Sequence, residues 1–517
     1  MEKHKIVIDG SSLSIADVAL VSRNVEVKVS ITDSAKEKIN VARSWVEKSI
    51  VNNDVVYGLS TGFGSFKNKV IKPEEAIELQ LNIARSHACG VGAPFTKEVV
   101  RAMMLLRANS LAQGYSGIRL SVVEKILEYL NHDIYPFVPQ QGSVGSSGDL
   151  APLCHMILTL IGEGECLVDG KRVPTADVLA SKKISPVVLS SKEGLALSNG
   201  TNAQTSVLTL ATYDALNLLE SADVIAALSV EVLMGSRKPF DPRVSKIRGQ
   251  LGQIECANNI ATLLAKSPII DSHKNCGRVQ DAYSLRCIPQ VHGASRDSIT
   301  HVKHIVEREI NAVTDNPLIF AEDDCAISGG NFHGEPIAQA ADFLKIAVAE
   351  LANISERRVA KMIDPATNDG LPAFLMDPSK GGLHSGLMIP QYVAAALVSE
   401  NKTLAHPASV DSIPTSANQE DHVSMGTIAA RHAALIVENT KNVLAIELLN
   451  NTQAYEFRSE NKLCTSSTWL YDEVRKFVPP CDADRPFYLD IERLRDFVGS
   501  RTIYNYLTKN VPEWRFA

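Results

Sequence analysis

The sequence predicts a mainly α-helical protein built around a bundle of long central helices, with a small mixed region near its amino terminus. Long segments are rich in alanine and carry apolar residues on most of their circumference, while strand-like pieces are short and occur early in the chain. A helix that is apolar on most of its circumference is typically buried among other helices. With 517 residues, 45% of them hydrophobic, the chain can bury a large core in more than one subdomain.

Three short strand-like pieces come before the long helices. They are KIVIDG (5–10), DVVYG (54–58) and CLVDGKRV (166–173). The last contains the dipeptide Asp169-Gly170, which is typical of a hairpin turn. We therefore expect two isolated strands and one hairpin.

The longest helices are expected within residues 201–235, 335–362 and 424–451. Pro336 fits the first turn of the second helix, where a backbone N–H has no partner in the helix. The chain has no low-complexity linker that would mark a domain boundary. We divide it into an N-terminal region over 1–200 and a helix bundle with a C-terminal helical region over 201–517.

Charge and composition exclude several classes of partner. The net charge is −7 and no segment is rich in lysine or arginine, so the chain offers no basic surface for nucleic acid. The amino terminus lacks the apolar run of a secretory signal, and the apolar stretches are too short and interrupted to span a bilayer. The nine cysteines form no CxxC pair. We expect a reduced cytoplasmic protein without a membrane or nucleic-acid partner.

Turn-rich stretches interrupt the helices at 60–65, 142–148, 266–277 and 364–386, and such loops commonly carry chemistry. The second leads into GSVGSSGDLAP (142–152), where Asp149 is predicted to cap a helix that has Pro152 in its first turn. A capped turn that binds phosphate is one interpretation. However, neither the lysine of a phosphate-binding loop, nor GxGxxG, nor the GxSxG spacing of a serine nucleophile is present there.

The triplet Ser146-Ser147-Gly148 fits a different chemistry. If the turn presses the Gly148 nitrogen onto the Ser146 carbonyl carbon, ring closure and loss of two waters give a five-membered imidazolone. The Ser147 side chain then becomes an exocyclic methylene. Glycine is needed at the third position because a Cβ would hinder the approach. The product is an electrophile that no ordinary side chain can imitate.

From about residue 55 to residue 456 the sequence resembles the aromatic amino acid ammonia-lyases, most closely their histidine-directed members. In that family the triplet forms 4-methylideneimidazol-5-one (MIO). The family usually has alanine where this chain has Ser146, but only the backbone carbonyl of that residue takes part in cyclisation. The matching motifs are YGLSTGFG, RSHACGVG, GSVGSSGDLAPL, EGLALSNGT, QDAYSLRCIPQVHG, TDNPL, SGGNFHGEP and SVDSIPTSANQEDHVSM.

The resemblance implies a fold of the aromatic ammonia-lyase and fumarase-like type and a homotetramer whose active sites draw on more than one subunit. It also implies non-oxidative elimination of ammonia from L-histidine to give trans-urocanate. Three rival functions share many of the same features. They are a phenylalanine or tyrosine ammonia-lyase, an aromatic aminomutase, and a helical scaffold or phosphate-binding module without catalytic activity.

The resemblance also implies roles for individual residues. Tyr57 matches the base that removes the β-proton, although it could be a half-buried aromatic at a strand end. Arg286 matches the clamp on the substrate carboxylate, a two-point contact that suits guanidinium, rather than a structural ion-pair partner. Asn199 matches a residue that hydrogen-bonds the prosthetic group or the substrate, and it could also cap the following helix. Gln280, Tyr283 and Phe332 match pocket residues, and packing is the simplest alternative for Phe332.

The substrate ring is expected to meet polar side chains. Ser86 and His87 stand where relatives that act on phenylalanine or tyrosine often carry another pair, and a histidine there can hydrogen-bond an imidazole. Glu420 can pair with an imidazole nitrogen, the alternative being a surface carboxylate. We infer no metal, because His301 and His304 lie opposite the apolar face of their predicted helix and are expected to face solvent.

Overall fold

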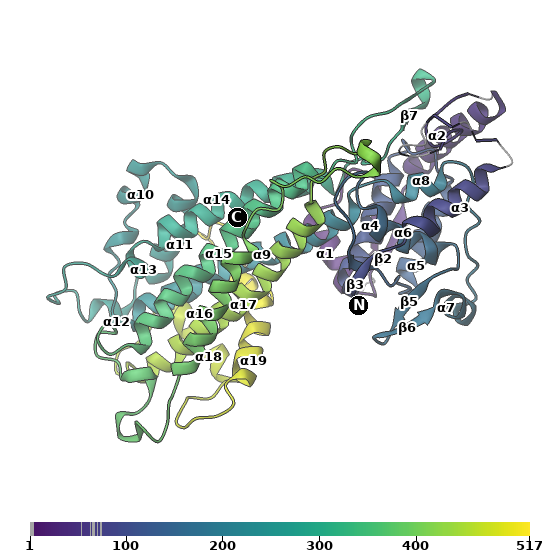
Figure 1. Ribbon diagram of the computed structural model, residues 1–517. Coiled ribbons are helices and arrows are strands. Elements are labelled where there is room, and N and C mark those ends of the chain that lie inside the picture. Colours follow the sequence, from purple (N-terminus) through teal and green to yellow (C-terminus); the bar gives the residue numbers. More distant parts are fainter. Residues whose placement is uncertain (1–4, 53, 63, 65–67, 70, 73–74) are drawn as a thin grey trace. The chain divides into compact units, whose positions relative to one another are not determined.

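The computed structural model describes the chain except residues 1–4, 53, 63, 65–67, 70, 73 and 74, and it is mainly helical (Figure 1). The chain forms two compact units. Unit 1 comprises Met1–Tyr213, Lys303–Asp342 and Pro407–Arg431, and unit 2 comprises Asp214–Val302, Phe343–His406 and His432–Ala517. Four of the five divisions fall within long helices, and the fifth, between His406 and Pro407, follows α16 (Met388–Leu404). The four helices are α9 (Asn202–Val232), α14 (Ile288–Glu309), α15 (Glu335–Ile363) and α17 (Gly426–Glu456).

Unit 1 contains the first eight helices. Within it α4 packs against α1 and α5, and α6 packs against α3 and α8. The bounds are α1 (Ile15–Arg23), α2 (Asp33–Asn52), α3 (Ala76–His87), α4 (Lys97–Ala112), α5 (Leu120–Asn131), α6 (Leu150–Leu160), α7 (Thr175–Lys182) and α8 (Glu193–Ser198), with the 3₁₀ turns η4 (Ala321–Asp323) and η7 (Ser416–Asn418).

The strands among the described residues of unit 1 form four separate two-stranded pairs. The first pair is parallel and the other three are antiparallel. The pairs are β1 (Lys5–Ile8) with β2 (Lys28–Ile31), β3 (Val91–Pro94) with β4 (Pro139–Gln141), β5 (Glu165–Val168) with β6 (Lys171–Pro174), and β7 (Leu318–Phe320) with β8 (Cys325–Ile327).

The described residues of unit 2 form helices joined by loops and contain no named strand. An apolar cluster joins α15, α16 and α17 through Ala352, Val359, Ala394, Val443 and Ile446. The bounds are α10 (Pro242–Arg248), α11 (Leu251–Leu264), α12 (Pro268–Asp271), α13 (Tyr283–Arg286), α16 (Met388–Leu404), α18 (Thr465–Arg475), α19 (Tyr488–Gly499) and α20 (Thr502–Asn510), with the 3₁₀ turns η3 (Lys238–Phe240), η5 (Ala373–Leu375) and η6 (Pro378–Lys380).

Buried polar contacts also connect the long helices inside unit 2. Arg296 of α14 pairs with Glu220 of α9 at 3.2 Å. The Ser295 hydroxyl donates to the Ala347 carbonyl of α15 at 2.8 Å. Because these groups are buried, each contact also fixes how neighbouring helices are rotated against one another.

The mainly α fold predicted from the sequence is confirmed, and so are the three long helices, which correspond to α9, α15 and α17. Pro336 lies in the first turn of α15 as predicted. The predicted hairpin is β5 and β6, and its turn residues Asp169 and Gly170 have φ of +47° and +74°. Positive φ at both turn positions matches the right-handed twist of the strands.

The strand predicted at residues 54–58 is wrong. The amides of Leu59 and Ser60 both donate to the Val56 carbonyl, at 3.1 and 3.0 Å, so the segment closes on itself as a turn. The Ser60 hydroxyl in turn accepts from the Val56 amide at 3.0 Å. Local hydrogen bonds from a serine therefore replaced strand pairing. Residues 63 and 65 of the neighbouring turn-rich stretch lie outside the described residues.

His301 and His304 are exposed on α14, as predicted, and Val302, Val306 and Ile310 are buried on the apolar face of that helix. No helix in the described part of the chain is both long and apolar enough to cross a membrane. 

Candidate active site

The loop that precedes α6 has a conformation that only glycine allows at two positions. Gly145 and Gly148 both have φ of +73°. A Cβ on Gly148 would lie 1.9 Å from the Gly200 carbonyl oxygen, and a Cβ on Gly145 would lie 2.2 Å from the Ser424 hydroxyl oxygen. Ser147, between them, has a left-handed φ of +52°. The backbone around the triplet is therefore both left-handed and crowded.

Backbone hydrogen bonds hold both ends of this loop. The Met425 amide donates to the Val144 carbonyl at 2.9 Å, and the Gly334 amide donates to the Gly145 carbonyl at 3.2 Å. On the other side, the Gly200 amide donates to the Ser147 carbonyl at 3.2 Å. The triplet is thus fixed between three distant segments of unit 1.

Asp149 occupies the predicted N-cap position of α6, but its side chain does not cap the helix. The carboxylate instead accepts from the hydroxyls of Ser143 and Thr427, at 2.8 and 2.6 Å, and from the Gln204 amide at 2.8 Å. Burial raises the pKa of Asp149, and these donors counteract the shift. The predicted capping role is therefore wrong: Asp149 connects the loop to α9 and α17.

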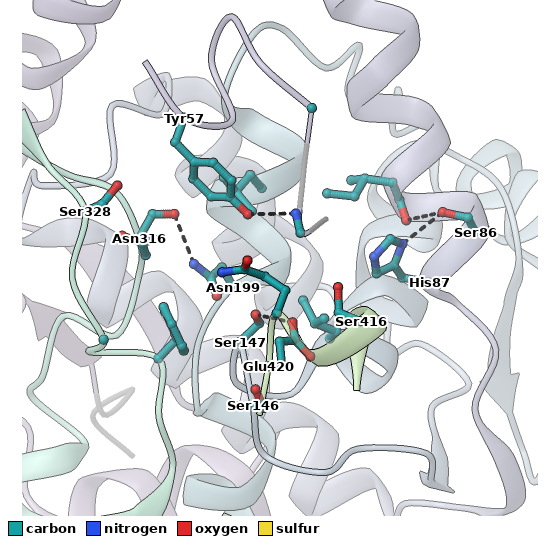
Figure 2. A pocket seen from close by; sticks show the side chains of 18 of the residues that line it. Tyr57, Ser86, His87, Ser146, Ser147, Asn199, Asn316, Ser328, Ser416 and Glu420 are labelled. Atoms are coloured by element: carbon teal, nitrogen blue, oxygen red, sulfur yellow. Dashed lines mark hydrogen bonds between the residues drawn. The ribbon is translucent and has the colours of Figure 1, made fainter. Parts of the chain in front are cut away.

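A cavity of about 1390 Å³ opens over the triplet, and all of its lining residues belong to unit 1 (Figure 2). Eight of the residues predicted from the sequence line it: Tyr57, Ser86, His87, Ser146, Ser147, Asn199, Phe332 and Glu420. Gly148 belongs to the same loop but lies behind this surface, against Gly200.

The other three predicted site residues, Gln280, Tyr283 and Arg286, lie in unit 2 and are not among the residues that line this cavity. Tyr283 begins α13 and is 71% exposed. The Arg286 guanidinium lies over its ring, 4.6 Å from the ring centre. The cavity of unit 1 is therefore defined without these three residues.

Glu420 lies against the triplet. Its Oε1 accepts a hydrogen bond from the Ser147 hydroxyl at 2.9 Å, and its Oε2 accepts one from the Thr415 hydroxyl at 2.6 Å. The backbones of Thr415 and Glu420 also pair with each other, at 2.9 and 3.3 Å, which turns this loop back toward the cavity. Figure 2 shows the carboxylate next to Ser147. The alternative of a surface carboxylate therefore does not fit.

Tyr57 lines the cavity with a phenol that is mostly buried. Its oxygen accepts a hydrogen bond from the Gly64 amide at 3.2 Å. Burial raises the pKa of Tyr57, the negative charge of Glu420 raises it further, and the Gly64 amide opposes the shift. Within one chain, this environment favours the protonated phenol.

Ser86 and His87 end helix α3 at the cavity. The Ser86 hydroxyl donates to the Asn82 carbonyl at 2.7 Å, so toward His87 Nδ1, 2.9 Å away, it acts as an acceptor. This arrangement assigns the proton of His87 to Nδ1 and leaves Nε2 as an acceptor. Burial lowers the pKa of His87, which favours the neutral imidazole.

Asn199 closes the deep side of the cavity. Its side-chain nitrogen donates to the Asn316 carbonyl at 3.0 Å (Figure 2). The same nitrogen lies 3.4 Å from the Asp315 carboxylate. The side chain therefore does not cap α9, which was one of the two roles expected from the sequence. Both partners come from the TDNPL motif, and the sequence did not assign a function to either.

Comparisons with known proteins show the family of the chain. A family model described as aromatic amino acid lyase matches residues 13–476. Histidine ammonia-lyase 1 of Fusobacterium nucleatum is 49% identical over 514 residues, which cover 99% of each chain. The crystal structure of histidine ammonia-lyase from Trypanosoma cruzi has a TM-score of 0.92 and 39% identity, over 98% of this chain and 96% of that one. Tyrosine aminomutase from Streptomyces globisporus also has a TM-score of 0.92, with 36% identity over 99% of this chain and 100% of that one.

Proposed function

The chain belongs to the aromatic amino acid lyase family, and we propose that it is a histidine ammonia-lyase, which eliminates ammonia from L-histidine to give trans-urocanate. The observation that carries the choice of substrate is the hydrogen bond between Glu420 and Ser147 at 2.9 Å. It puts a carboxylate beside the triplet, where the ring of the substrate needs a polar partner. 

The triplet fits the MIO group that the family resemblance implies. Gly148 leaves no room for a Cβ, and the Ser147 hydroxyl, which the cyclisation removes as water, lies at the cavity surface. Ser146 contributes only its carbonyl, so its side chain does not interfere with ring closure. Once formed, this group supplies an electrophile that takes up electron density from the substrate.

Formation of the ring also changes the hydrogen bonds that Glu420 accepts. Its Oε1 accepts from Ser147 in the unmodified chain, and dehydration of Ser147 removes that donor while Thr415 still holds Oε2. Glu420 is then free to accept an N–H of the substrate imidazole. His87 Nε2 is a second acceptor on the same cavity wall. 

These two acceptors disfavour a benzene ring, which has no donor and would leave Glu420 and His87 without partners, at a cost of about 1–3 kcal/mol for each unpaired group. A phenol offers one O–H donor, whereas a protonated imidazole offers two N–H donors. This argument ranks phenylalanine lowest and tyrosine between phenylalanine and histidine. It applies equally to the lyase and the aminomutase reactions of those amino acids.

Tyr57 is the proposed base for the β-proton. Burial raises its pKa, so the free chain holds the phenol protonated at neutral pH. The ammonium group of a bound amino acid favours the phenolate, because an opposite charge stabilises the ionised form. Activity should therefore increase as the pH rises above neutrality.

We further propose a cytoplasmic homotetramer in which Gln280, Tyr283 and Arg286 of one subunit complete the cavity of another. The exposure of Tyr283 supports this arrangement, because an exposed aromatic side chain is available to another subunit. Arg286 would hold the substrate carboxylate by two parallel hydrogen bonds.

The decisive experiment is a spectrophotometric assay of the purified protein with L-histidine, L-phenylalanine and L-tyrosine. Urocanate should form much faster than cinnamate or coumarate. Faster formation of cinnamate or coumarate would contradict the proposed substrate but would still be consistent with the lyase chemistry. An intact-mass measurement tests the chemistry separately, because the chain should be two waters lighter than its sequence.

A further inference from the structure

The amide of Asn199 has only one orientation compatible with its neighbours. The two groups around its nitrogen, the Asn316 carbonyl and the Asp315 carboxylate, are both acceptors. The amide NH₂ must therefore point toward them. Asn199 Oδ1 then has no hydrogen-bond partner among the described residues, although the side chain is only 2% exposed and lines the cavity.

A buried ion pair fixes the acceptors. Asp315 Oδ2 accepts from the Lys192 ammonium at 2.9 Å, and the two side chains are 1% and 0% exposed. Asp315 Oδ1 also accepts from the Asn316 amide at 2.7 Å. Both carboxylate oxygens of Asp315 thus accept hydrogen bonds, and Asp315 presents an acceptor toward Asn199.

The backbone of Asn199 is held as firmly as its side chain. Arg107, which is fully buried, donates to the Asn199 carbonyl and to the Asn202 side chain, both at 2.9 Å. With the backbone and the amide nitrogen both fixed, rotation of the side chain cannot turn Oδ1 away from the cavity without breaking two hydrogen bonds.

An oxygen acceptor at the cavity surface recognises an N–H donor. The proposed substrate carries its strongest donors on the amino group, because an ammonium has three N–H bonds and forms charge-assisted hydrogen bonds. A carboxylate, which only accepts, has nothing to offer this oxygen. The polarity of the site thus separates the amino end of the substrate from its carboxylate end.

We propose that Lys192 and Asp315 are positioning residues that hold the Asn199 amide with Oδ1 toward the cavity, where it accepts an N–H of the substrate amino group. This inference rests on the proposed function. Neither Lys192 nor Asp315 needs to touch the substrate, because both act through the orientation of Asn199.

The test changes the hydrogen-bonding groups and charges of Asp315 and Lys192 while keeping side chains of similar shape. Asp315→Asn presents an amide that can donate as well as accept, so Asn199 can turn over. Because this change leaves Lys192 buried without its partner, the double variant Lys192→Met/Asp315→Asn, which removes both charges, is made alongside it. Each is introduced into the full-length Ser147→Ala protein, which binds the amino acid without converting it.

Binding is measured by calorimetry with L-histidine and with imidazolepropionate, which lacks the amino group. In both variants the affinity for L-histidine should fall about tenfold to a hundredfold, the value of a hydrogen bond to a charged group, and the affinity for imidazolepropionate should stay unchanged. An equal loss for both ligands, or no loss for either, would overturn the proposal. 

Glu447→Gln is the matched control, because it breaks another fully buried ion pair, that with Arg358 in unit 2. It should leave the ratio of the two affinities unchanged. If the parent Ser147→Ala protein binds L-phenylalanine or L-tyrosine but not L-histidine, the proposed substrate fails. The same comparison then uses that amino acid and its own deamino analogue, so that the positioning role is still judged.

Discussion

Each unit of the chain buries an ion pair, and the two pairs have different surroundings. In unit 1, Lys192 and Asp315 are 1% and 0% exposed, and the pair leads through one hydrogen bond to Asn199 on the cavity wall. In unit 2, Arg358 and Glu447 are both 0% exposed. Glu447 also accepts from the Ser229 and Ser355 hydroxyls, at 2.5 Å each, and none of these four residues lines the cavity.

The difference teaches that burial of charge alone does not identify a functional site. The Glu447 network links α9, α15 and α17, so its effect is to fix how these helices pack. Removing one partner of such a pair typically costs about 3–5 kcal/mol of stability. The pair in unit 1 carries the same cost, but it also determines which atom of Asn199 faces the cavity.

A second cluster in unit 2 supports the same distinction. Ligand atoms of Asp223, Cys256 and His292 lie within 4.8 Å of one another, which is a spacing that a metal ion could use. However, the Arg296 guanidinium already lies 3.1 Å from the Asp223 carboxylate, and His292 Nδ1 lies 2.7 Å from it. These hydrogen bonds satisfy the carboxylate without a metal ion.

The largest contrast between the units is expected for two serine hydroxyls that both bind a glutamate. Ser147→Ala in unit 1 should abolish the prosthetic group and reduce turnover by about three orders of magnitude or more, because the exocyclic methylene comes from that side chain. Ser229→Ala in unit 2 should instead lower the free energy of unfolding by about 1–3 kcal/mol, because Glu447 loses a buried donor. Intact mass, turnover and thermal unfolding are measured on both variants.

Ser146→Ala is the control within the triplet. Only the carbonyl of Ser146 takes part in ring closure, so this variant should mature and keep most of its activity. If Ser146→Ala lost the prosthetic group and Ser147→Ala kept it, the roles within the triplet would be reversed.

A substitution at the cavity wall that leaves the triplet unchanged separates substrate recognition from formation of the prosthetic group. Glu420→Ala should reduce turnover of L-histidine by about a hundredfold or more, which is the range for loss of a side chain that acts as a general acid or base. The chain should still be two waters lighter by mass, since Glu420 is not part of the ring. Full turnover in this variant would remove Glu420 from substrate recognition.

Arg286→Lys tests whether a residue of unit 2 contributes to substrate binding. An ammonium cannot reproduce a two-point clamp on a carboxylate, so the KM for L-histidine should rise by about tenfold or more, with the prosthetic group intact. An unchanged KM would exclude Arg286 from the site.

Mixed oligomers show which subunit supplies Arg286. Co-expressed Ser147→Ala and Arg286→Ala chains should be more active together than either alone, because some cavities then combine an intact triplet with an intact arginine. Absence of any gain, with mixed oligomers demonstrated by differently tagged chains, would mean that the site is not shared between subunits.

The smallest expected effect is a loss of stability in acid, to which both units contribute. Burial lowers the pKa of His292 from its ordinary value of 6.5, so the folded state keeps this imidazole neutral while the unfolded chain takes up a proton. Stability is therefore unaffected above the unfolded pKa and falls as the pH drops below about 6.5. The shift in His87, which is less deeply buried, has the same sign.

Thermal unfolding at about pH 7.5 and about pH 5.5 checks this effect. His292→Gln should flatten the dependence of the midpoint on pH more than His87→Gln does. Equal slopes in wild type and His292→Gln would attribute the acid sensitivity to other groups.

Local sequence was sufficient for much of the fold. Alanine-rich apolar segments correctly predicted α9, α15 and α17, and the Asp169-Gly170 turn correctly predicted a hairpin, because both patterns depend on residues that are close together in the chain. The predicted strand at 54–58 failed for the opposite reason. There the Ser60 side chain accepts a hydrogen bond from the Val56 amide, which competes with strand pairing. Strand propensities of single residues do not include such a contact.

Much of the candidate site was also accessible from the sequence, because the triplet chemistry and the family motifs name its residues. The network behind Asn199 was missed. Lys192 lies immediately before EGLALS (193–198), a segment of mainly small and apolar residues, and this position was the available signal. Its partner Asp315 is 123 residues away, and no local pattern links the two.

The sequence by itself determined that the chain is mainly helical, that it carries the triplet Ser146-Ser147-Gly148, and which residues resemble those of a lyase. Only the tertiary structure decided which of these residues share a cavity, that Asp149 ties the loop to α9 and α17 instead of capping α6, and that Asn199 faces the cavity with its oxygen. The physical reason is the range of the interactions. Helix periodicity and turn conformation are set by neighbours in the chain, whereas burial, pKa and amide orientation depend on groups that only folding brings together.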